Sequence, residues 1–167
     1  LDPFDKAAFD EIDQSIEQVL GRNRVVTPDD VRGGKASLEA AVKAGGWPTL
    51  DKARGKFVFL MLVPGMNLKT FGPYLEGRPN LEGRMAFVQG EPGMNHTAFV
   101  MIDNALTQGE RIKTLVGQGY IVRTRSDIDT YEARQDDATR RDAALASGAQ
   151  IVSTDYPWAP NIFGNGY

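Results

Sequence analysis

The order of apolar and polar positions along the chain predicts short strands that alternate with helices. Seven consecutive apolar residues, 57–63, are typical of a strand that is buried on both faces, as in the parallel sheets of α/β proteins. Similar but shorter runs follow. The predicted strands span residues 57–63, 84–90, 97–103, 120–125 and 150–154. We expect all of them except the second to be neighbouring parallel strands, with their polar ends on one side.

Helical patterns lie before and between these strands. The first twenty residues place five apolar side chains on one helical stripe: Phe9, Ile12, Ile16, Val19 and Leu20. Asp2 is the expected N-cap of this helix. Two later helices, within 109–119 and 137–148, are each followed by a strand after a glycine. Because such alternation is typical of βαβ units, the sequence predicts one α/β domain or part of one.

Composition and charge narrow the class of protein. The chain has 167 residues, 41% hydrophobic, and no apolar run near the roughly 18 residues of a membrane span. Its net charge of -3, without a clustered basic face, argues against a nucleic-acid partner. The absence of cysteine excludes disulfides, thiolate catalysis and cysteine metal sites. The N-terminus lacks the pattern of a signal peptide and begins directly in a helix, so we interpret the chain as a fragment or a processed piece.

Two arginines at the end of a predicted strand form the best candidate site. Arg123 and Arg125 alternate with smaller residues, so their side chains are expected on one face of the strand, at its C-terminal end. Paired guanidinium groups there suit the oxygens of a phosphate or a carboxylate. Alternatively, both arginines pair with Asp127, Asp129 or Glu132 and brace a loop.

Several other polar and aromatic residues have open roles. Asp103 and Asp155 each follow a predicted strand, where either can ligate a metal, act as a base or cap the next turn. His96, the only histidine, is expected to be a loop residue rather than a catalyst. Trp47 and Trp158 are expected to be packing residues rather than platforms for a substrate. The sequence has no phosphate-binding glycine loop, dinucleotide fingerprint, nucleophile elbow or zinc-ligand spacing.

Arg140 and Arg141 break a local rule. They fall in the first turns of a predicted helix, where the helix dipole disfavours positive charge. Such a violation can mark a functional site. An ion pair with Asp137 or Asp142 explains it equally well.

The segments "VVTPDDVRG", "GWPTLDKARGKFVFLM" and above all residues 120–157, "VRTRSD" to "STDYP", carry a family resemblance. The chain resembles the calcium-dependent phosphoinositide-specific phospholipase C-like family, within the phospholipase C-like phosphodiesterases. The resemblance implies an α/β fold of the (β/α)8 TIM-barrel type, with residues 1–167 as the C-terminal part of a single barrel domain. It also implies a hydrolase of lipid metabolism that cleaves a phospholipid phosphodiester with Ca2+ and two histidines.

The family's histidines and acidic calcium ligands belong to the N-terminal half of the barrel, so the resemblance assigns no catalytic and no metal-ligating residue here. It implies that this half supplies Arg123, Arg125, Asp155 and Tyr156 to the barrel mouth as substrate-binding residues. The missing N-terminal half is the expected partner, and the chain alone is expected to be inactive. Secretion fits the resemblance, although the sequence itself leaves localisation open.

Two departures from the family pattern keep two other functions open. One is the loop over residues 65–79, "GMNLKTFGPYLEGRP". Leu62 and Val63 stand where the resemblance suggests an acidic residue. A glycerophosphodiester phosphodiesterase on the same barrel is one alternative. The other is a catalytically inactive barrel that binds phosphorylated ligands.

Overall fold

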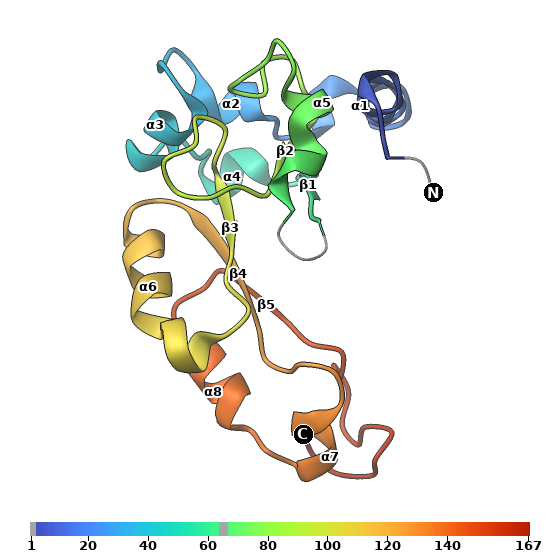
Figure 1. The fold of residues 1–167 in the computed structure, drawn as a ribbon, viewed down its shortest axis with the longest axis vertical. Coiled ribbons are helices and arrows are strands. Elements are labelled where there is room, and N and C mark those ends of the chain that lie inside the picture. Colours follow the sequence, from blue (N-terminus) through green and yellow to red (C-terminus); the bar gives the residue numbers. More distant parts are fainter. Residues whose placement is uncertain (1–2, 64–66) are drawn as a thin grey trace. The chain divides into compact units, whose positions relative to one another are not determined.

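The computed structural model describes residues 3–63 and 67–167, and the chain divides into two compact units, residues 1–99 and 100–167 (Figure 1). The first unit contains α1 (Lys6–Leu20), η1 (Arg22–Arg24), α2 (Pro28–Arg32), α3 (Leu38–Lys43), α4 (Leu50–Ala53), β1 (Phe59–Met61), η3 (Leu68–Phe71), α5 (Gly72–Leu75) and β2 (Ala86–Val88). Strand β3 (Phe99–Met101) crosses the boundary. The second unit continues with α6 (Ala105–Gly117), β4 (Ile121–Arg125), α7 (Tyr131–Gln135), α8 (Thr139–Ala146) and β5 (Ile151–Ser153).

In the described residues the strands form two small sheets with parallel pairs. In the first sheet β1 pairs with β2, and Leu60 lies opposite Phe87. In the second sheet β4 pairs in parallel with β5 and has β3 as its other neighbour. The predicted parallel pairing of the last two strands is confirmed. The strand over 57–63 does not join their sheet as predicted, because within the described residues β1 pairs with β2, the strand that the prediction left out. The described residues do not close into a barrel, so the (β/α)8 barrel and the single domain stay predictions.

Strand β1 differs from the prediction of a strand buried on both faces. Its three residues are only partly buried, and Phe57, Val58 and Leu62 beside it are about half exposed. Within the described residues β1 pairs with β2, and a single bridge joins Val25 to Phe57. An uninterrupted apolar run therefore does not guarantee that both faces of a strand are covered by this chain.

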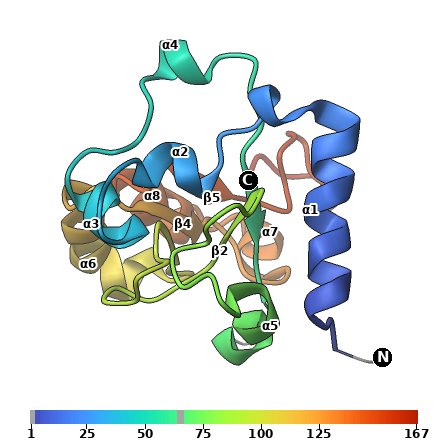
Figure 2. The same ribbon diagram turned by 90° about the horizontal axis from the view of Figure 1, so that it is seen from above.

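Helix α1 also differs in detail. Asp2, the predicted N-cap, lies outside the described residues, whereas the Asp5 carboxylate accepts a 2.8 Å hydrogen bond from the N–H of Ala8 and caps α1. Val19, which the stripe placed on the buried face, is exposed, while Asp13 is buried. Figure 2 shows α1 side-on. The ring centroid of Phe9, in α1, lies 5.2 Å from that of Tyr74, in α5. This helix is thus anchored near its N-terminal half by α5.

A buried ionic group explains why Asp13 faces inward. The guanidinium of Arg84, just before β2, donates from Nη1 to Asp13 at 3.0 Å and also to Asp10. The Tyr74 hydroxyl donates to Asp13 at 2.7 Å, and the Arg84 guanidinium lies 4.1 Å from the Tyr74 ring centroid. Burial and the Asp13 charge raise the pKa of Tyr74 far above its ordinary value. We call Asp10, Asp13, Tyr74 and Arg84 the Arg84 network.

Aromatic packing completes the core of the first unit. The Trp47 ring centroid lies 5.4 Å from those of Phe87 and Phe99, which confirms the packing role predicted for Trp47. Phe87 is fully buried, and Phe99 is nearly so.

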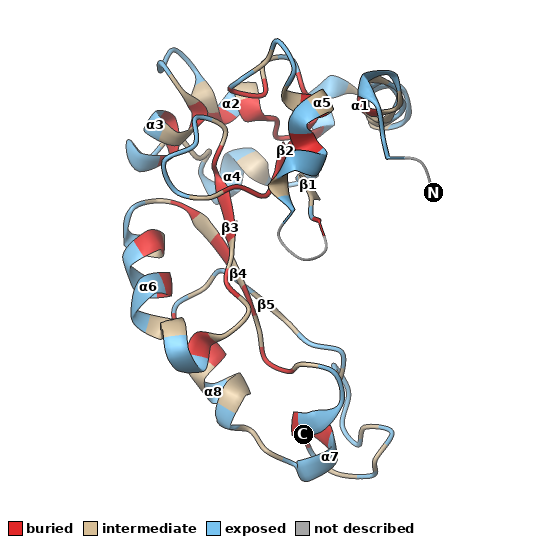
Figure 3. Ribbon diagram, viewed as in Figure 1, coloured by how far each residue is buried: buried red, intermediate tan, exposed pale blue. Residues whose placement is uncertain are grey.

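In the second unit, helices cover one side of the sheet. Helices α6 and α8 lie side by side and pack against β4 (Figure 1). Buried residues lie on β3, on β4 and on patches of both helices (Figure 3). Ile112, Ala144 and Val122 are fully buried. The other face of β4 carries Ile121, Arg123 and Arg125, which are partly exposed.

Candidate functional site

The two arginines of β4 share one partly exposed face of the strand. Burial alternates along β4, so Val122 and Thr124 are fully buried while Arg123 and Arg125 are partly exposed. The predicted alternation is therefore confirmed. Because β4 and β5 are parallel and Arg125 lies opposite Ser153, Asp155 follows at the same end of the sheet.

Each of these arginines is paired with a carboxylate from a neighbouring strand end. Arg123 Nη1 donates to Asp103 Oδ1 at 2.6 Å, and Arg125 Nη2 donates to Asp155 Oδ2 at 3.3 Å. The arginine side chains are 21% and 25% exposed, and their acids 45% and 63%. We call these four residues the arginine rim. The rim remains open to a ligand from solvent.

The acids of the rim are not those that the loop-brace alternative named. Asp103 and Asp155 each come two residues after a strand that flanks β4, so their side chains meet those of Arg123 and Arg125. The sequence leaves the roles of Asp103 and Asp155 open between metal ligand, base and cap, and the family resemblance adds substrate binding for Asp155. In the structure each of these side chains pairs with an arginine. The cap of α6 is Asn104, whose side chain accepts from the N–H of Leu106.

Asp127, one of the acids expected to pair with the arginines, is buried below the rim. Its carboxylate accepts from the Ser126 hydroxyl at 2.7 Å, the Thr154 hydroxyl at 2.6 Å and the N–H of Asp155 at 3.0 Å. It therefore joins the loop after β4 to the loop after β5. This link holds the backbone that presents Asp155.

Tyr156 lies beside the rim, but its hydroxyl is committed to the backbone. It donates to the carbonyl of Asp129 at 3.3 Å. The Tyr156 ring centroid lies 5.9 Å from Phe163 and 6.1 Å from Tyr167. The structure therefore places Tyr156 as part of an aromatic cluster next to Asp155.

Arg140 and Arg141 are both ion-paired. Arg140 Nε donates to Glu132 at 2.6 Å, a partner that the sequence had not suggested for it. Arg141 Nε donates to Asp142 at 3.3 Å, as one alternative predicted. Asp137 instead accepts from the N–H of Thr139. These ion pairs compensate the unfavourable interaction of both arginines with the helix dipole. They therefore explain why the two arginines are tolerated in the first turns of α8, without a functional role.

The pair of Glu132 and Arg140 is the more buried of the two. Burial alone would raise the pKa of Glu132, but the N–H of Ile128 and the Arg140 guanidinium hold that pKa below its ordinary value. Glu132 is therefore charged at neutral pH. Its charge stabilises the turn that leads from β4 into α7.

His96 lies in the first unit, in the segment between β2 and β3, as predicted for a loop residue. Burial lowers its pKa below the ordinary value, and the Glu39 charge offsets part of this. The imidazole is consequently neutral at pH 7.

The described residues do not fit a complete calcium site. Within residues 3–63 and 67–167, no group of three or more His, Cys, Asp or Glu side chains is arranged to hold a metal ion. The two exposed carboxylates of the rim, Asp103 and Asp155, are engaged by arginine. We therefore derive no chemical step through calcium from this chain.

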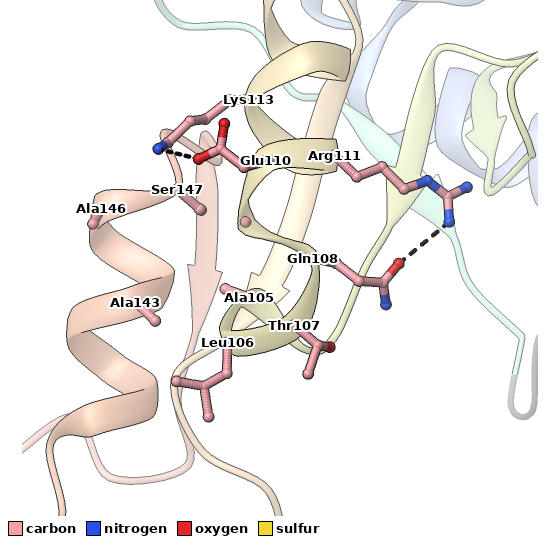
Figure 4. Close-up of a pocket in the computed structure, with 11 residues that line it drawn as sticks. Ala105, Leu106, Thr107, Gln108, Glu110, Arg111, Lys113, Ala143, Ala146 and Ser147 are labelled. Carbon is pink, nitrogen blue, oxygen red and sulfur yellow. Dashed lines mark hydrogen bonds and ion pairs between the residues drawn. The ribbon is translucent and has the colours of Figure 1, made fainter.

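One hollow lies away from the rim, in the helical layer of the second unit. It has a volume of about 380 Å³ and lies between the start of α6 and α8 (Figure 4). A Glu110–Lys113 ion pair and a hydrogen bond from Arg111 to Gln108 lie along its α6 side. None of the predicted site residues lines it.

A second hollow, of about 370 Å³, adjoins the site through Tyr156. Tyr167, Leu145 and Trp158 also line it. Trp158 is 80% exposed, so the prediction that it is a packing residue is wrong. The reason is its place on a loop beyond β5, where nothing in the described chain covers it.

Across the part of the chain that the structure describes, no helix is long and apolar enough to span a bilayer.

Comparisons with known proteins bear directly on this arrangement. The fold is similar to that of a Ca2+-dependent phosphatidylinositol-specific phospholipase C from Streptomyces antibioticus, with a TM-score of 0.60 and 24% sequence identity. The match covers 87% of this chain and 57% of that structure's chain. A comparison with curated proteins found no match. The model of a family described as phosphoinositide phospholipase C, Ca2+-dependent, matches residues 1–167. The chain therefore belongs to the family of Ca2+-dependent phosphoinositide phospholipases C.

Proposed function

We propose that the full-length protein is a phosphoric diester hydrolase that cleaves the headgroup phosphodiester of a phosphoinositide. In this proposal residues 1–167 are the C-terminal part of one (β/α)8 barrel. The family match over the whole chain supports the activity, and the parallel strands with their polar carboxyl ends support the barrel. The match covers 57% of the similar structure's chain, and in this proposal the rest of the barrel comes from residues outside this chain.

The observation that carries the proposal is the arginine rim. Arg123 and Arg125 present two guanidinium groups from one strand face, and each is held by one carboxylate. A guanidinium can bind a phosphate oxygen while a carboxylate still orients it, because it has five N–H donors. Asp103 and Asp155 thus hold the arginines in place before the substrate arrives. The bound phosphate then receives hydrogen bonds that need little rearrangement.

The remaining chemistry is assigned to the other half of the barrel. The proton-transferring histidines and the calcium ligands of this family would come from residues outside this chain. Tyr156 contributes to the wall beside Asp155, and Asp127 holds the loop that carries both residues. By itself, the chain is proposed to bind and orient the phosphodiester without cleaving it.

The test replaces both Arg123 and Arg125 with Met in the full-length enzyme. We expect kcat/KM for phosphatidylinositol to fall by at least about 100-fold, since each lost donor to developing charge commonly costs that much. The melting temperature should change little, because exposed ion pairs contribute little to stability. Arg54→Met is the matched control, since Arg54 forms an exposed ion pair with Asp51.

Two outcomes would contradict this assignment. A large fall in melting temperature with unchanged turnover of the folded enzyme would show that the rim is a brace. If the enzyme cleaves glycerophosphodiesters efficiently but not phosphatidylinositol, the proposed substrate is wrong. The proposed class of reaction, hydrolysis of a phosphodiester, would still hold.

A further inference from the structure

The two ion pairs of the arginine rim are supported in different ways. Asp103, the partner of Arg123, comes directly before α6, and the side chain of Asn104 caps that helix. The start of α6 therefore fixes the backbone that carries Asp103. Asp155, the partner of Arg125, follows β5 and leads into a segment that the structure describes without a helix or a strand. Its backbone must be held by another interaction.

The hydroxyl of Thr154 makes two hydrogen bonds at this point. It accepts from the N–H of Tyr156 at 3.0 Å and donates to Asp127 Oδ2 at 2.6 Å. A hydroxyl group has one proton and two acceptor lone pairs, so both bonds can form at once. The first bond closes a local turn between a threonine side chain and the backbone two residues on. The second bond ties this turn to a buried carboxylate.

The other oxygen of that carboxylate binds the neighbouring backbone group. Asp127 Oδ1 accepts from the N–H of Asp155 at 3.0 Å. Asp127 is only 1% exposed, and its Oδ2 also accepts from the Ser126 hydroxyl at 2.7 Å, so it is a fixed anchor. The N–H groups of Asp155 and Tyr156 are thus both held, one by Asp127 and one by Thr154. We call Thr154 and Asp127 the β5 clamp.

The β5 clamp determines the direction of the Asp155 side chain. Arg125 Nη2 donates to Asp155 Oδ2 at 3.3 Å, and the Asp155 side chain is 63% exposed. Because packing does not hold an exposed side chain, its direction depends on the backbone torsions of its own residue and its neighbours. Loss of either bond of the Thr154 hydroxyl would let these torsions vary. Arg125 would then lose the partner that orients its guanidinium.

Thr154 itself is an exposed residue. Substitutions of exposed residues usually change the stability of the fold little. An effect of the Thr154 hydroxyl on the site can therefore be separated from an effect on folding.

We propose that Thr154 is a positioning residue of the arginine rim. Its hydroxyl fixes Asp155, and through Asp155 it orients Arg125 toward the phosphodiester. Thr154 acts on the Arg125 side of the rim alone, since the pair of Arg123 and Asp103 is held by α6. The importance of Thr154 for turnover rests on the proposed function, whereas the orientation of Arg125 can be measured without turnover.

The first experiment compares two substitutions of Thr154 in the full-length protein. Thr154→Val keeps the shape of the side chain and removes the hydroxyl, whereas Thr154→Ser keeps the hydroxyl. We expect kcat/KM for phosphatidylinositol to fall about tenfold in Thr154→Val and to stay within about twofold of wild type in Thr154→Ser, because rates depend steeply on the placement of binding groups. Thr107→Val, at an exposed threonine of α6, is the matched control and should leave kcat/KM unchanged.

A double variant shows whether Thr154 acts through Asp155. Added to Asp155→Asn, Thr154→Val should lower kcat/KM by less than about twofold further, because the group that it positions is already altered. Two independent roles would instead multiply the two separate losses. Full multiplication would overturn the proposal.

A chemical measurement tests the same role without turnover. Phenylglyoxal modifies guanidinium groups, and an ion pair with a carboxylate slows this reaction. Peptide mass spectrometry gives the modification rate of Arg125 relative to that of Arg123 in the same protein. We expect this ratio to rise about threefold or more in Thr154→Val and to keep its wild-type value in Thr154→Ser and Thr107→Val. Thr154→Ala also lacks the hydroxyl and replaces Thr154→Val if the valine variant does not fold.

The two measurements keep the positioning role apart from the proposed function. If the full-length protein cleaves no phosphatidylinositol but the ratio rises in the variants without the hydroxyl, the proposed function fails and the positioning role stands. Wild-type values of both the ratio and kcat/KM in these variants would overturn the role. Equal losses of kcat/KM in Thr154→Ser and Thr154→Val would also overturn it, since the hydroxyl would not be their cause.

Discussion

Both units of the chain contain arginine–carboxylate pairs, but the pairs differ in burial. In the first unit the Arg84 side chain is 0% exposed and lies against Asp13 and Tyr74. In the second unit Arg123 and Arg125 are partly exposed and their acids are more so. The same chemistry therefore has different consequences. Removing one residue of a buried ion pair leaves the charge of the other buried and uncompensated. In an exposed ion pair the arginine can exchange its carboxylate for a ligand at little cost.

The largest expected effect breaks the buried side of this comparison. Arg84→Met should lower the free energy of unfolding by about 3–5 kcal/mol, because Asp13 would be left buried without its cation. Urea unfolding followed by circular dichroism measures this change. Arg54→Met removes an exposed ion pair and should cost no more than about 0.5 kcal/mol. Equal effects of the two substitutions would show that burial does not distinguish these arginines.

An intermediate effect is expected from the buried acid of the second unit. Asp127→Ala should lower the free energy of unfolding by about 2–3 kcal/mol, since hydrogen bonds from Thr154 and Asp155 to a charged group are lost. Asp127→Asn retains an acceptor oxygen and should cost less. Urea unfolding of the two variants in parallel tests this order. An alanine variant as stable as wild type would mean that Asp127 does not secure the loops beneath the rim.

The smallest expected effect depends on pH. Glu132 has a pKa below its ordinary value of 4.5 in the folded protein, so its stabilising charge is fully present above that pH and is lost as pH falls through the folded pKa. Glu132→Gln should therefore cost about 1.5 kcal/mol at pH 7, and the difference from wild type should shrink below about pH 4.5.

Urea unfolding at several pH values between 3 and 7 measures this difference. Glu110→Gln, at an exposed pair with Lys113, should show almost none at any pH. A Glu132→Gln deficit that is the same at pH 3.5 and pH 7 would contradict the assigned charge.

Local patterns predicted much of the fold. The strand over 120–125 and its parallel partner over 150–154 were found because short apolar runs were bounded by turns and followed helices. The pattern failed where burial depends on other parts of the molecule. Phe57 and Leu62 are apolar but half exposed, and Val19 lies on a helical stripe but faces solvent. The periodicity of apolar residues predicts which residues lie on the same face of a helix or strand. It does not predict whether another part of the molecule covers that face.

For the site, the alternation along β4 was sufficient to place Arg123 and Arg125 on one face. The sequence placed Asp103 and Asp155 at strand ends, and the family resemblance placed Asp155 with the arginines. The ion pairs themselves were not predicted, because Asp103 is 20 residues from Arg123 and Asp155 is 30 residues from Arg125. A usable signal existed, since both acids come two residues after a strand. Asp127 and Arg84 gave no comparable signal. A charged residue next to an apolar run is ordinarily solvent-exposed, and only the folded chain shows that these two are buried.

The Arg84 network also has a consequence for the order of folding. Its hydrogen bonds join Asp13 to Tyr74 and Arg84, over 61 and 71 residues of chain. The pairs of the second unit close loops of only 20 and 30 residues. Closing a longer loop costs more chain entropy, and contacts of high sequence separation slow folding. During synthesis α1 therefore emerges well before its partners, and Asp13 remains solvated until the segment around Arg84 has left the ribosome.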